Sequence, residues 1–273
     1  MSANFSDRTV IITGASAGVG AACARAFAAH QANLVLVARG QQGLDQIAAE
    51  LAPLCEVYTQ AMDVADQEQC IALLKNAQER FGGVDILINN AGMHSRGDLE
   101  KVAVDDLAAM VDVNLRAPIV LSRAAIPHLR QSTMAAIVMV GSLAGRAPLQ
   151  GAATYSATKA GLRAFTYAMA DELKPYAINV GVVSPGPIDT GFIMEEIDNV
   201  EDIVFSQPMS SADQVAASVL ALAAGPKNEI SMPTVSGWLT TISYLFPTLR
   251  RKLRPQLYKI GRKNKDKYRH RKI

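Results

Sequence analysis

The residues with the clearest chemical potential are Tyr155 and Lys159, which stand four positions apart in the run Tyr-Ser-Ala-Thr-Lys. In a helix this spacing places both side chains on one face, one turn apart. A free phenol has a pKa of roughly 10 and stays protonated at neutral pH. A neighbouring ammonium group favours the phenolate, so the pair predicts a tyrosine that can exchange protons with a substrate. On its own, the pair also fits a solvated helix face.

Other reactive side chains narrow the chemistry. Ser142 lies on a predicted loop before the Tyr155 helix, where its hydroxyl could hydrogen-bond a substrate carbonyl. The four histidines are scattered along the chain, so we expect no histidine-based metal site. The three cysteines are odd in number and lack metal-ligand spacing, which is typical of free thiols in a reducing compartment. They are Cys23, Cys55 and Cys70.

The composition sets the class of protein. With 273 residues, 49% hydrophobic and 19% charged, the chain suits one large α/β domain with a sizeable core. No apolar run reaches the roughly 18 residues that a membrane-spanning helix needs. The first eight residues lack an apolar signal region and lead straight into a strand, so we expect a cytoplasmic protein.

A glycine-rich segment follows the first predicted strand, residues 9–12, and precedes an alanine-rich helix that reaches about residue 30. It holds Gly14, Gly18 and Gly20 in the spacing Gly-x-x-x-Gly-x-Gly. Glycines permit a tight turn and a close approach of the backbone, and the helix start offers unpaired N–H groups to phosphate. The segment therefore predicts a site for the pyrophosphate of a dinucleotide.

The end of the second predicted strand, residues 33–39, bears on which dinucleotide binds. An NAD site carries an acidic residue there for the ribose 2′-hydroxyl, but this chain has Ala38 and then Arg39. A guanidinium can hold a 2′-phosphate through charge-assisted hydrogen bonds. We therefore expect NADP(H), with NAD as the alternative.

Strands and helices alternate along the rest of the chain. Further strands are predicted at residues 57–61, 86–88, 136–140 and 178–183. Helices are predicted at residues 42–51, 67–81, 104–114 with a continuation toward 129, 155–173 and 212–224. This alternation predicts an α/β fold with a single doubly wound, Rossmann-like parallel sheet and helices on both faces. Ligands of such sheets bind beyond the carboxyl ends of the strands, where every motif above falls.

Six motifs together resemble one family, the short-chain dehydrogenase/reductase superfamily. They occur in this order: Thr13-Gly14-x-x-x-Gly18-x-Gly20, Asn89-Asn90-Ala91-Gly92, Asn114, Ser142, Tyr155-x-x-x-Lys159 and Pro185-Gly186. The similarity covers residues 5–230.

The resemblance implies roles for these residues. Tyr155 would be the general acid in carbonyl reduction, Lys159 would bind the nicotinamide ribose and lower the tyrosine pKa, and Ser142 would orient the carbonyl. Asn114 would hold a water that links Lys159 to solvent. The implied cofactor contacts are Gly14, Ser16, Gly18, Val19, Gly20, Arg39, Asp63, Val64, Asn90, Tyr155, Lys159, Pro185, Gly186, Ile188 and Thr190. Hydride transfer itself belongs to the cofactor.

The C-terminal part departs from the family pattern. Many relatives end with a glycine-rich strand after their last helix, whereas this chain has Glu-Ile-Ser-Met-Pro at 229–233 and then a long tail. We therefore predict a catalytic domain over residues 1–230, with a lid over residues 191–209, and an amphipathic, basic extension over residues 231–273. The lid carries Phe192, Ile193, Met194, Ile197 and Phe205, which favours a lipophilic substrate.

The extension combines an apolar half and a charged half. The apolar half follows a helical spacing that Pro247 interrupts. Its residues are Val235, Trp238, Leu239, Ile242, Leu245, Phe246 and Leu249. Residues 250–272 hold twelve Lys or Arg and one Asp, hence +11, and since the chain totals +2 the remainder carries −9. A basic amphipathic helix fits attachment to an anionic, cytoplasmic membrane face. The alternatives are a helix over the substrate cleft, a contact in a homodimer, and a solvated, partly disordered tail.

The sequence thus predicts an enzyme that reduces a lipophilic ketone or aldehyde, or oxidises the alcohol, with NADP(H). The alternative is a dinucleotide-sensing or membrane-tethered scaffold without turnover, which an intact Ser-Tyr-Lys-Asn set disfavours. We expect no nucleic-acid partner, because the tail lacks interleaved aromatics beyond Tyr258 and Tyr268. We expect a homo-oligomer, with a dimer favoured.

Overall fold

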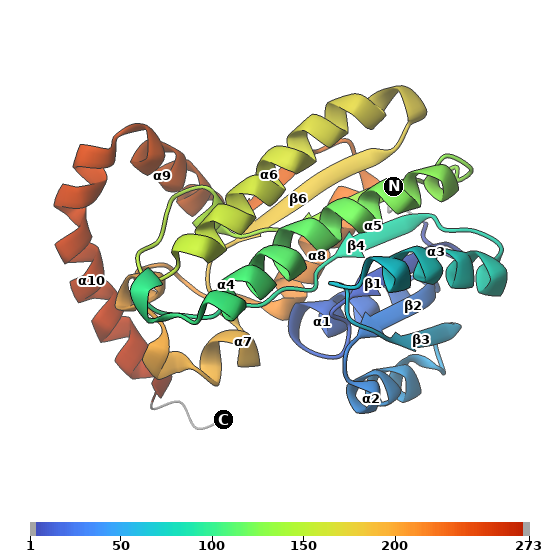
Figure 1. The fold of residues 1–273 in the computed structure, drawn as a ribbon, viewed down its shortest axis with the longest axis horizontal. Coiled ribbons are helices and arrows are strands. Elements are labelled where there is room, and N and C mark those ends of the chain that lie inside the picture. Colours follow the sequence, from blue (N-terminus) through green and yellow to red (C-terminus); the bar gives the residue numbers. More distant parts are fainter. Residues whose placement is uncertain (1–3, 270–273) are drawn as a thin grey trace.

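A parallel sheet of seven strands lies at the centre of the computed structural model, which describes residues 4–269 (Figure 1). The strand order is β3-β2-β1-β4-β5-β6-β9, and every pairing is parallel. The order reverses between β1 and β4, which is where doubly wound sheets open a crevice for a ligand. The strands are β1 Thr9–Thr13, β2 Asn33–Ala38, β3 Val57–Ala61, β4 Ile86–Asn89, β5 Ala136–Val140, β6 Asn179–Pro185 and β9 Glu229–Met232.

Helices cover both faces of the sheet. Side chains of a strand alternate between faces, so Val10 and Ile12 pack into one core and Ile11 packs into the other. The first core is closed by α1 Gly18–Ala28, α2 Gln41–Leu51 and α8 Ala212–Ala224. The second core is closed by α3 Gln67–Phe81, α5 Ala117–Leu129 and α6 Ala153–Leu173. The predicted fold class is confirmed.

The predicted α-helix over residues 104–114, with its continuation toward residue 129, is wrong in one respect. The structure has α4 Val104–Val111, then a π-helical turn Asp112–Arg116, and then α5. The turn brings Asn114 inside, where its side chain bonds the backbone of Met93. Single π-turns of this kind are frequent at functional sites. Short 3₁₀ turns complete the fold at Leu99–Lys101, Leu143–Gly145 and Lys174–Tyr176.

The segment after α8 is a strand despite its lack of a glycine-rich motif. β9 pairs in parallel with β6, and Ile230 and Met232 pack against the first core. The predicted start of the extension at residue 231 therefore falls inside the sheet.

Residues 191–209, which we call the lid segment, form a small folded unit. It contains α7 Gly191–Met194 and the 3₁₀ turns Ile197–Asn199 and Asp202–Ser206, between the paired strands β7 Ile188–Asp189 and β8 Ser210–Ser211. Ile193, Val200 and Phe205 are buried in a cluster of their own. The expectation that Ile193 and Phe205 line a substrate cleft is therefore wrong, because they fill the interior of the lid segment instead.

The chain ends in two helices, α9 Thr234–Leu245 and α10 Pro247–Arg269, which arc along one end of the molecule (Figure 1). Pro247 begins α10, where a proline costs no hydrogen bond. As far as residue 269, the tail after β9 is helical and α10 packs on the lid segment, so the alternative of a partly disordered tail is wrong there. Arg271 and Lys272 lie outside the described residues. Between residues 4 and 269 we find no helix with the length and apolarity to cross a membrane.

The contact between α10 and the lid segment is close. A Cβ on Gly261 would overlap the carbonyl oxygen of Asp202, so only glycine fits there. Lys265 is 4% exposed, and its Nζ donates to the carbonyl oxygen of Val200 at 2.6 Å and pairs with Asp202 at 3.4 Å. Tyr258 adds a hydrogen bond to Glu201 at 2.8 Å. The inner face of α10 therefore holds the lid segment in place.

Candidate active site

The four side chains predicted to do chemistry converge beyond the carboxyl ends of β4 and β5. Tyr155 and Lys159 lie on the first two turns of α6. Ser142 lies two residues beyond the end of β5, and Asn114 lies in the π-turn. Asn114 is fully buried and Lys159 is 5% exposed. A Cβ built on Gly92 would lie 3.3 Å from Asn114 Oδ1 and 3.6 Å from Lys159 Nζ, so the two groups face the same point.

The environment of Tyr155 controls its proton. Burial raises the pKa of Tyr155, while a hydrogen bond with Ser142 and the charge of Arg96 act in the opposite direction. Lys159 is not what sets this pKa, because its Nζ lies 5.8 Å from the ring centroid and donates to the carbonyl oxygen of Val140 at 2.9 Å. Burial also lowers the pKa of Lys159 to about 8. The expected lowering of the Tyr155 pKa by Lys159 is therefore not found in this structure, where burial raises that pKa.

Asn114 is held by backbone and side-chain partners. Its Oδ1 accepts from the Met93 N–H at 2.8 Å, and its Nδ2 donates to the Met93 carbonyl at 2.9 Å. A longer contact of 3.4 Å leads to Thr158, whose hydroxyl donates to the Tyr155 carbonyl. The amide of Asn114 thus ties the loop after β4 to the turn of α6 that carries Tyr155.

The glycine-rich loop after β1 is shaped for close approach of a ligand. Gly14 and Gly18 have φ values of 66° and 54°, which favour glycine. A Cβ on Gly20 would overlap the Gly14 carbonyl oxygen, so α1 and the loop touch backbone to backbone. Ser16 and Val19 lie half-buried on the same loop, and α1 starts without a side-chain cap. Its first N–H groups are available to an anion, so the loop fits the pyrophosphate of a dinucleotide.

Arg39 lies where the sequence placed it, just beyond the carboxyl end of β2. The glycine-rich loop reaches β2 through a hydrogen bond from the Ala15 N–H to the Val37 carbonyl, two residues before Arg39. The side chain of Arg39 is exposed. Asp63 and Val64 follow β3 at the same edge of the sheet, Asp63 exposed and Val64 buried.

Asn90 and the segment after β6 close the crevice. Asn90 Nδ2 donates to the carbonyl oxygens of Thr13 at 2.8 Å and Gly14 at 3.2 Å, so it fixes the glycine-rich loop. Thr190 comes within 3.7 Å of the Cβ position on Gly18. Pro185, Gly186 and Ile188 lead from β6 to Thr190 along the same edge. The structure thus gathers the residues predicted to contact the cofactor along the carboxyl edge of the sheet.

Comparison with known proteins assigns the family. The family model described as short chain dehydrogenase matches residues 8–201. The chain belongs to the short-chain dehydrogenase family. Among curated relatives, it is 35% identical over 215 residues to the ketoacyl reductase HetN of Nostoc sp., covering 78% of this chain and 75% of that protein.

Two further relatives match over most of their length. The dehydrogenase/reductase SDR family member 7B of Xenopus tropicalis is 31% identical, with 97% of this chain and 90% of that protein covered. A short-chain dehydrogenase of Burkholderia cenocepacia, solved in complex with NADP, superposes with a TM-score of 0.77 at 32% identity, covering 84% of this chain and 97% of that one. As a short-chain dehydrogenase/reductase, the protein is an enzyme that acts on CH–OH or carbonyl groups with NAD(P).

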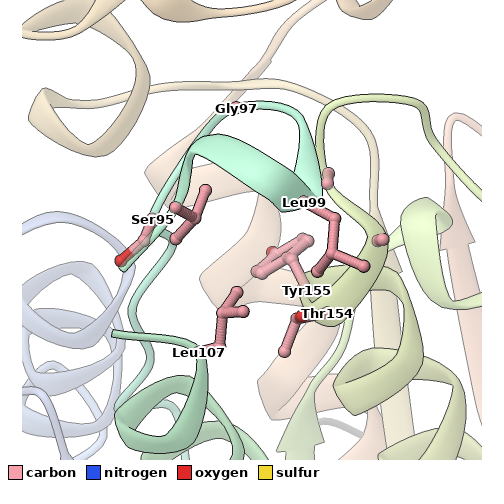
Figure 2. A pocket seen from close by; sticks show the side chains of 9 residues that line it. Ser95, Gly97, Leu99, Leu107, Thr154 and Tyr155 are labelled. Atoms are coloured by element: carbon pink, nitrogen blue, oxygen red, sulfur yellow. The ribbon is translucent and has the colours of Figure 1, made fainter. Parts of the chain in front are cut away.

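In this short-chain dehydrogenase, an apolar hollow flanks Tyr155. Figure 2 shows Leu99 and Leu107 near the ring of Tyr155, with Ser95 also among the lining residues. Leu99 and Leu107 come from the region between β4 and the π-turn, and no motif in the sequence pointed to them.

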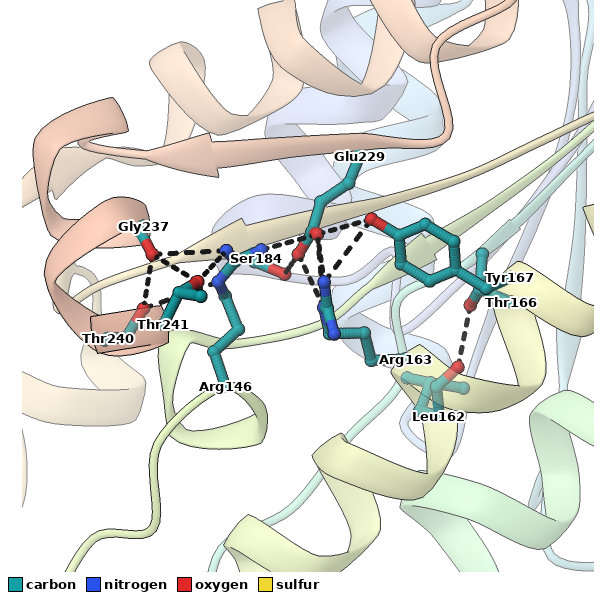
Figure 3. A network of polar contacts seen from close by, with 10 residues as sticks. All are labelled: Arg146, Leu162, Arg163, Thr166, Tyr167, Ser184, Glu229, Gly237, Thr240 and Thr241. Atoms are coloured by element: carbon teal, nitrogen blue, oxygen red, sulfur yellow. Dashed lines mark hydrogen bonds and ion pairs between the residues drawn. The ribbon is translucent and has the colours of Figure 1, made fainter. Parts of the chain in front are cut away.

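A polar network that sequence reasoning missed joins the segments carrying the site. Glu229, at the start of β9, accepts from Arg163 at 2.8 Å and from Ser184 at 2.7 Å, and it forms an ion pair with Arg146 (Figure 3). Arg146 follows Ser142 by four residues, Arg163 follows Lys159 by four, and Ser184 precedes Pro185. Arg146 also bonds the Gly237 carbonyl and Thr241 on α9. The short distance in sequence from Arg146, Arg163 and Ser184 to the predicted site residues was the signal that could have found them.

His94 and Arg96 were also missed. The His94 ring stacks on Tyr155 with centroids 4.2 Å apart and an angle of 14° between planes. Arg96 Nη1 lies 2.9 Å from His94 Nδ1, while its other nitrogens bond Glu196 and the Phe192 carbonyl of the lid segment. Their position just past the carboxyl end of β4 was the signal that could have found them.

Proposed function

We propose that this enzyme reduces a lipophilic ketone or aldehyde with NADPH, or oxidises the corresponding alcohol with NADP⁺, and that Tyr155 exchanges the proton. The convergence of Tyr155, Ser142, Lys159 and Asn114 beside the glycine-rich loop carries this proposal. The name of the Nostoc relative supports a ketoacyl compound as one candidate substrate. The apolar side chains of Leu99 and Leu107 beside Tyr155 support a lipophilic one.

The residues of the chain divide the work. A bound nicotinamide supplies the hydride to the carbonyl carbon. The Ser142 hydroxyl donates a hydrogen bond to the carbonyl oxygen, which holds it within reach of Tyr155. Tyr155 gives its proton to that oxygen as the alcohol forms. Lys159, one turn further along α6, would bind the nicotinamide ribose. Asn114 bonds the backbone of Met93 and so fixes the loop beside Lys159.

The cofactor would lie along the carboxyl edge of the sheet. The pyrophosphate would be held by the glycine-rich loop and the start of α1, through Gly14, Ser16, Gly18, Val19 and Gly20. The 2′-phosphate that distinguishes NADP(H) would be held by Arg39. Asp63 and Val64 would contact the adenine end. Asn90 and residues 185–190 would contact the nicotinamide end. The NADP complex of the Burkholderia structure supports the NADP preference.

Replacing Tyr155 with Phe tests the proposal. It removes the proton donor but keeps the ring and its stacking, so turnover should fall by about 10²–10⁴-fold while NADPH still binds. Activity is measured as NADPH consumption with a panel of ketones, aldehydes and ketoacyl esters, and binding by NADPH fluorescence. Retention of more than about a tenth of the activity refutes the role of Tyr155. Binding of NADPH without turnover of any compound by the unmutated protein would favour the scaffold alternative.

We also propose that α9 and α10 attach the enzyme to an anionic membrane surface on the cytoplasmic side. α9 exposes large apolar side chains that no described residue covers, among them Trp238 at 70% and Leu245 at 65%. The outer face of α10 exposes Leu249, Leu253 and Ile260. Interspersed with them are the exposed Lys252, Lys259 and Lys263. An apolar strip bordered by lysines is what an interfacial helix requires.

Co-sedimentation with vesicles tests this attachment. Each lysine near an anionic surface contributes about 1 kcal/mol, so replacing three with Gln should weaken binding roughly 100-fold or more. The variant is Lys252→Gln, Lys259→Gln and Lys263→Gln, and the control replaces Lys75, Lys101 and Lys174 elsewhere on the surface. If the unmutated protein ignores phosphatidylserine vesicles at low salt, or prefers DNA to them, the attachment is refuted.

We further propose that the enzyme is a homodimer. Leu99, Val104 and Val111 are exposed near the start and end of α4, with Val104 at 79%. Burying such a strip against a second copy would remove apolar surface from water. Light scattering should give twice the chain mass, and Val104→Glu should yield a monomer. A monomeric unmutated protein contradicts the proposal.

A further inference from the structure

His94 presents a hydrogen-bond donor that the protein itself does not use. A guanidinium only donates, so the 2.9 Å contact from Arg96 Nη1 makes His94 Nδ1 the acceptor. The ring proton of a neutral imidazole then resides on Nε2. Nε2 is buried and has no hydrogen-bond partner within residues 4–269.

The imidazole is held neutral. Burial lowers the pKa of His94 to about 3, and the charges of Arg96 and Lys159 add to this effect. Arg96 also bonds Glu196 and the Phe192 carbonyl, so the tautomer of His94 is fixed by a residue anchored in the lid segment. His94 is therefore a preset donor at physiological pH and not a proton shuttle.

The donor lies beside the reacting group. The His94 ring stacks on the ring of Tyr155 with centroids 4.2 Å apart, so the imidazole lies directly against the proposed proton donor. A buried donor without a partner costs stability, and native proteins keep such groups where a ligand or water completes them. A substrate whose carbonyl meets Tyr155 would bring its neighbouring atoms to His94.

We propose that His94 Nε2–H binds a second oxygen acceptor of the substrate, so the enzyme selects carbonyl compounds that carry a further carbonyl, ester or hydroxyl oxygen close to the reacting group. This assignment rests on the proposed function and names its substrate class. His94 is then a specificity-determining substrate contact, and Arg96 is a positioning residue that acts through it. A simple ketone of the same length lacks the acceptor and leaves the donor unpaired.

A substrate pair and two variants test the assignment. The pair is a β-keto ester and the plain ketone in which a methylene replaces the ester carbonyl, both measured with NADPH. His94→Phe keeps the stacked ring and removes the donor. We expect kcat/KM for the keto ester to fall at least about tenfold more than kcat/KM for the ketone. His94→Gln returns an N–H donor and should recover part of the loss for the keto ester alone.

The outcomes are separable. Equal losses for both substrates, or no loss for either, overturn the assignment. Failure of the unmutated enzyme on both substrates instead refutes the proposed function. A readout independent of activity is the ¹⁵N shift of the His94 ring, which should show the neutral Nε2–H tautomer from pH 5 to 8. A protonated ring at pH 6 overturns the assignment even if the kinetics agree.

Discussion

Replacing Glu229 with Gln should remove a large, pH-dependent part of the folding stability. Glu229 binds Arg146, Arg163 and Ser184, and its side chain is only 8% exposed (Figure 3). Gln keeps the shape and one acceptor oxygen but removes the charge that both arginines face. Removing one partner of a buried ion pair commonly costs about 3–5 kcal/mol, because the remaining charge is left uncompensated.

The pKa of Glu229 gives an independent magnitude. Burial would raise this pKa, but hydrogen bonds from Arg163, Arg146, Ser184 and Tyr167 outweigh it and lower the value from 4.5 to about 2. At about 1.4 kcal/mol per pKa unit, the ionised carboxylate contributes about 3 kcal/mol. Because the folded-state pKa is depressed, this stability is fully present above pH 4.5 and is lost as the pH falls toward 2.

Urea unfolding of both proteins at several pH values measures the effect. The variant should be about 3 kcal/mol less stable at pH 7, and the difference should narrow steadily between pH 4.5 and pH 3. Glu50→Gln is the matched control, because Glu50 pairs with Arg25 at an exposed site where such pairs contribute about 0.2–1 kcal/mol. A difference below about 1 kcal/mol at pH 7, or one that does not change with pH, would refute this reasoning.

Three further changes probe the lid segment and the cofactor crevice. Lys265→Met should weaken the contact between α10 and the lid segment by about 2–4 kcal/mol and speed hydrogen exchange in the lid segment. Lys263→Met, on the exposed face of α10, should do neither. Equal hydrogen exchange in the two variants would disprove that Lys265 holds the lid segment in place. Arg39→Ala should weaken NADPH binding by about 1.5–3 kcal/mol and leave NADH binding unchanged, and equal affinity of the unmutated enzyme for both cofactors would contradict the NADP preference. Gly20→Ala should abolish cofactor binding, since its Cβ would meet the Gly14 carbonyl, whereas Gly40→Ala meets no atom within 4 Å; retained binding by Gly20→Ala would show that the loop can yield.

The regular part of the fold could be predicted because local pattern and global fold agree there. Residues 57–61, 67–81, 136–140 and 212–224 form the predicted strands and helices with the predicted bounds. Buried strands of a parallel sheet are continuous apolar runs, and the helices between them repeat every three to four residues. The π-turn at Asp112–Arg116 could not be predicted this way, since its cause is a tertiary contact between Asn114 and Met93.

The site divides along the same line. Tyr155, Lys159, Ser142 and the glycine-rich loop stand in short motifs that together resemble those of a known family, so the sequence could propose them as a site. Glu229 could not be found, because its partners lie 45 to 83 residues away in sequence. The position of Phe205 was predicted wrongly, because an apolar residue in a lid can either line a cleft or fill the interior of the lid. Only the packing of Phe205 against Tyr268 shows that it fills the interior.

The contact of α10 with the lid segment and the proposed membrane attachment would use opposite faces of this helix. Its inner face, with Tyr258, Gly261 and Lys265, holds the lid segment, and its outer face carries Leu253 and Lys259. A membrane on the outer face would not compete for the inner contacts, because helical side chains on opposite faces do not share partners. Deleting the helix would therefore remove both contacts at once and confuse their effects. Substituting only the outer lysines separates them, since vesicle binding should fall while hydrogen exchange in the lid segment stays the same.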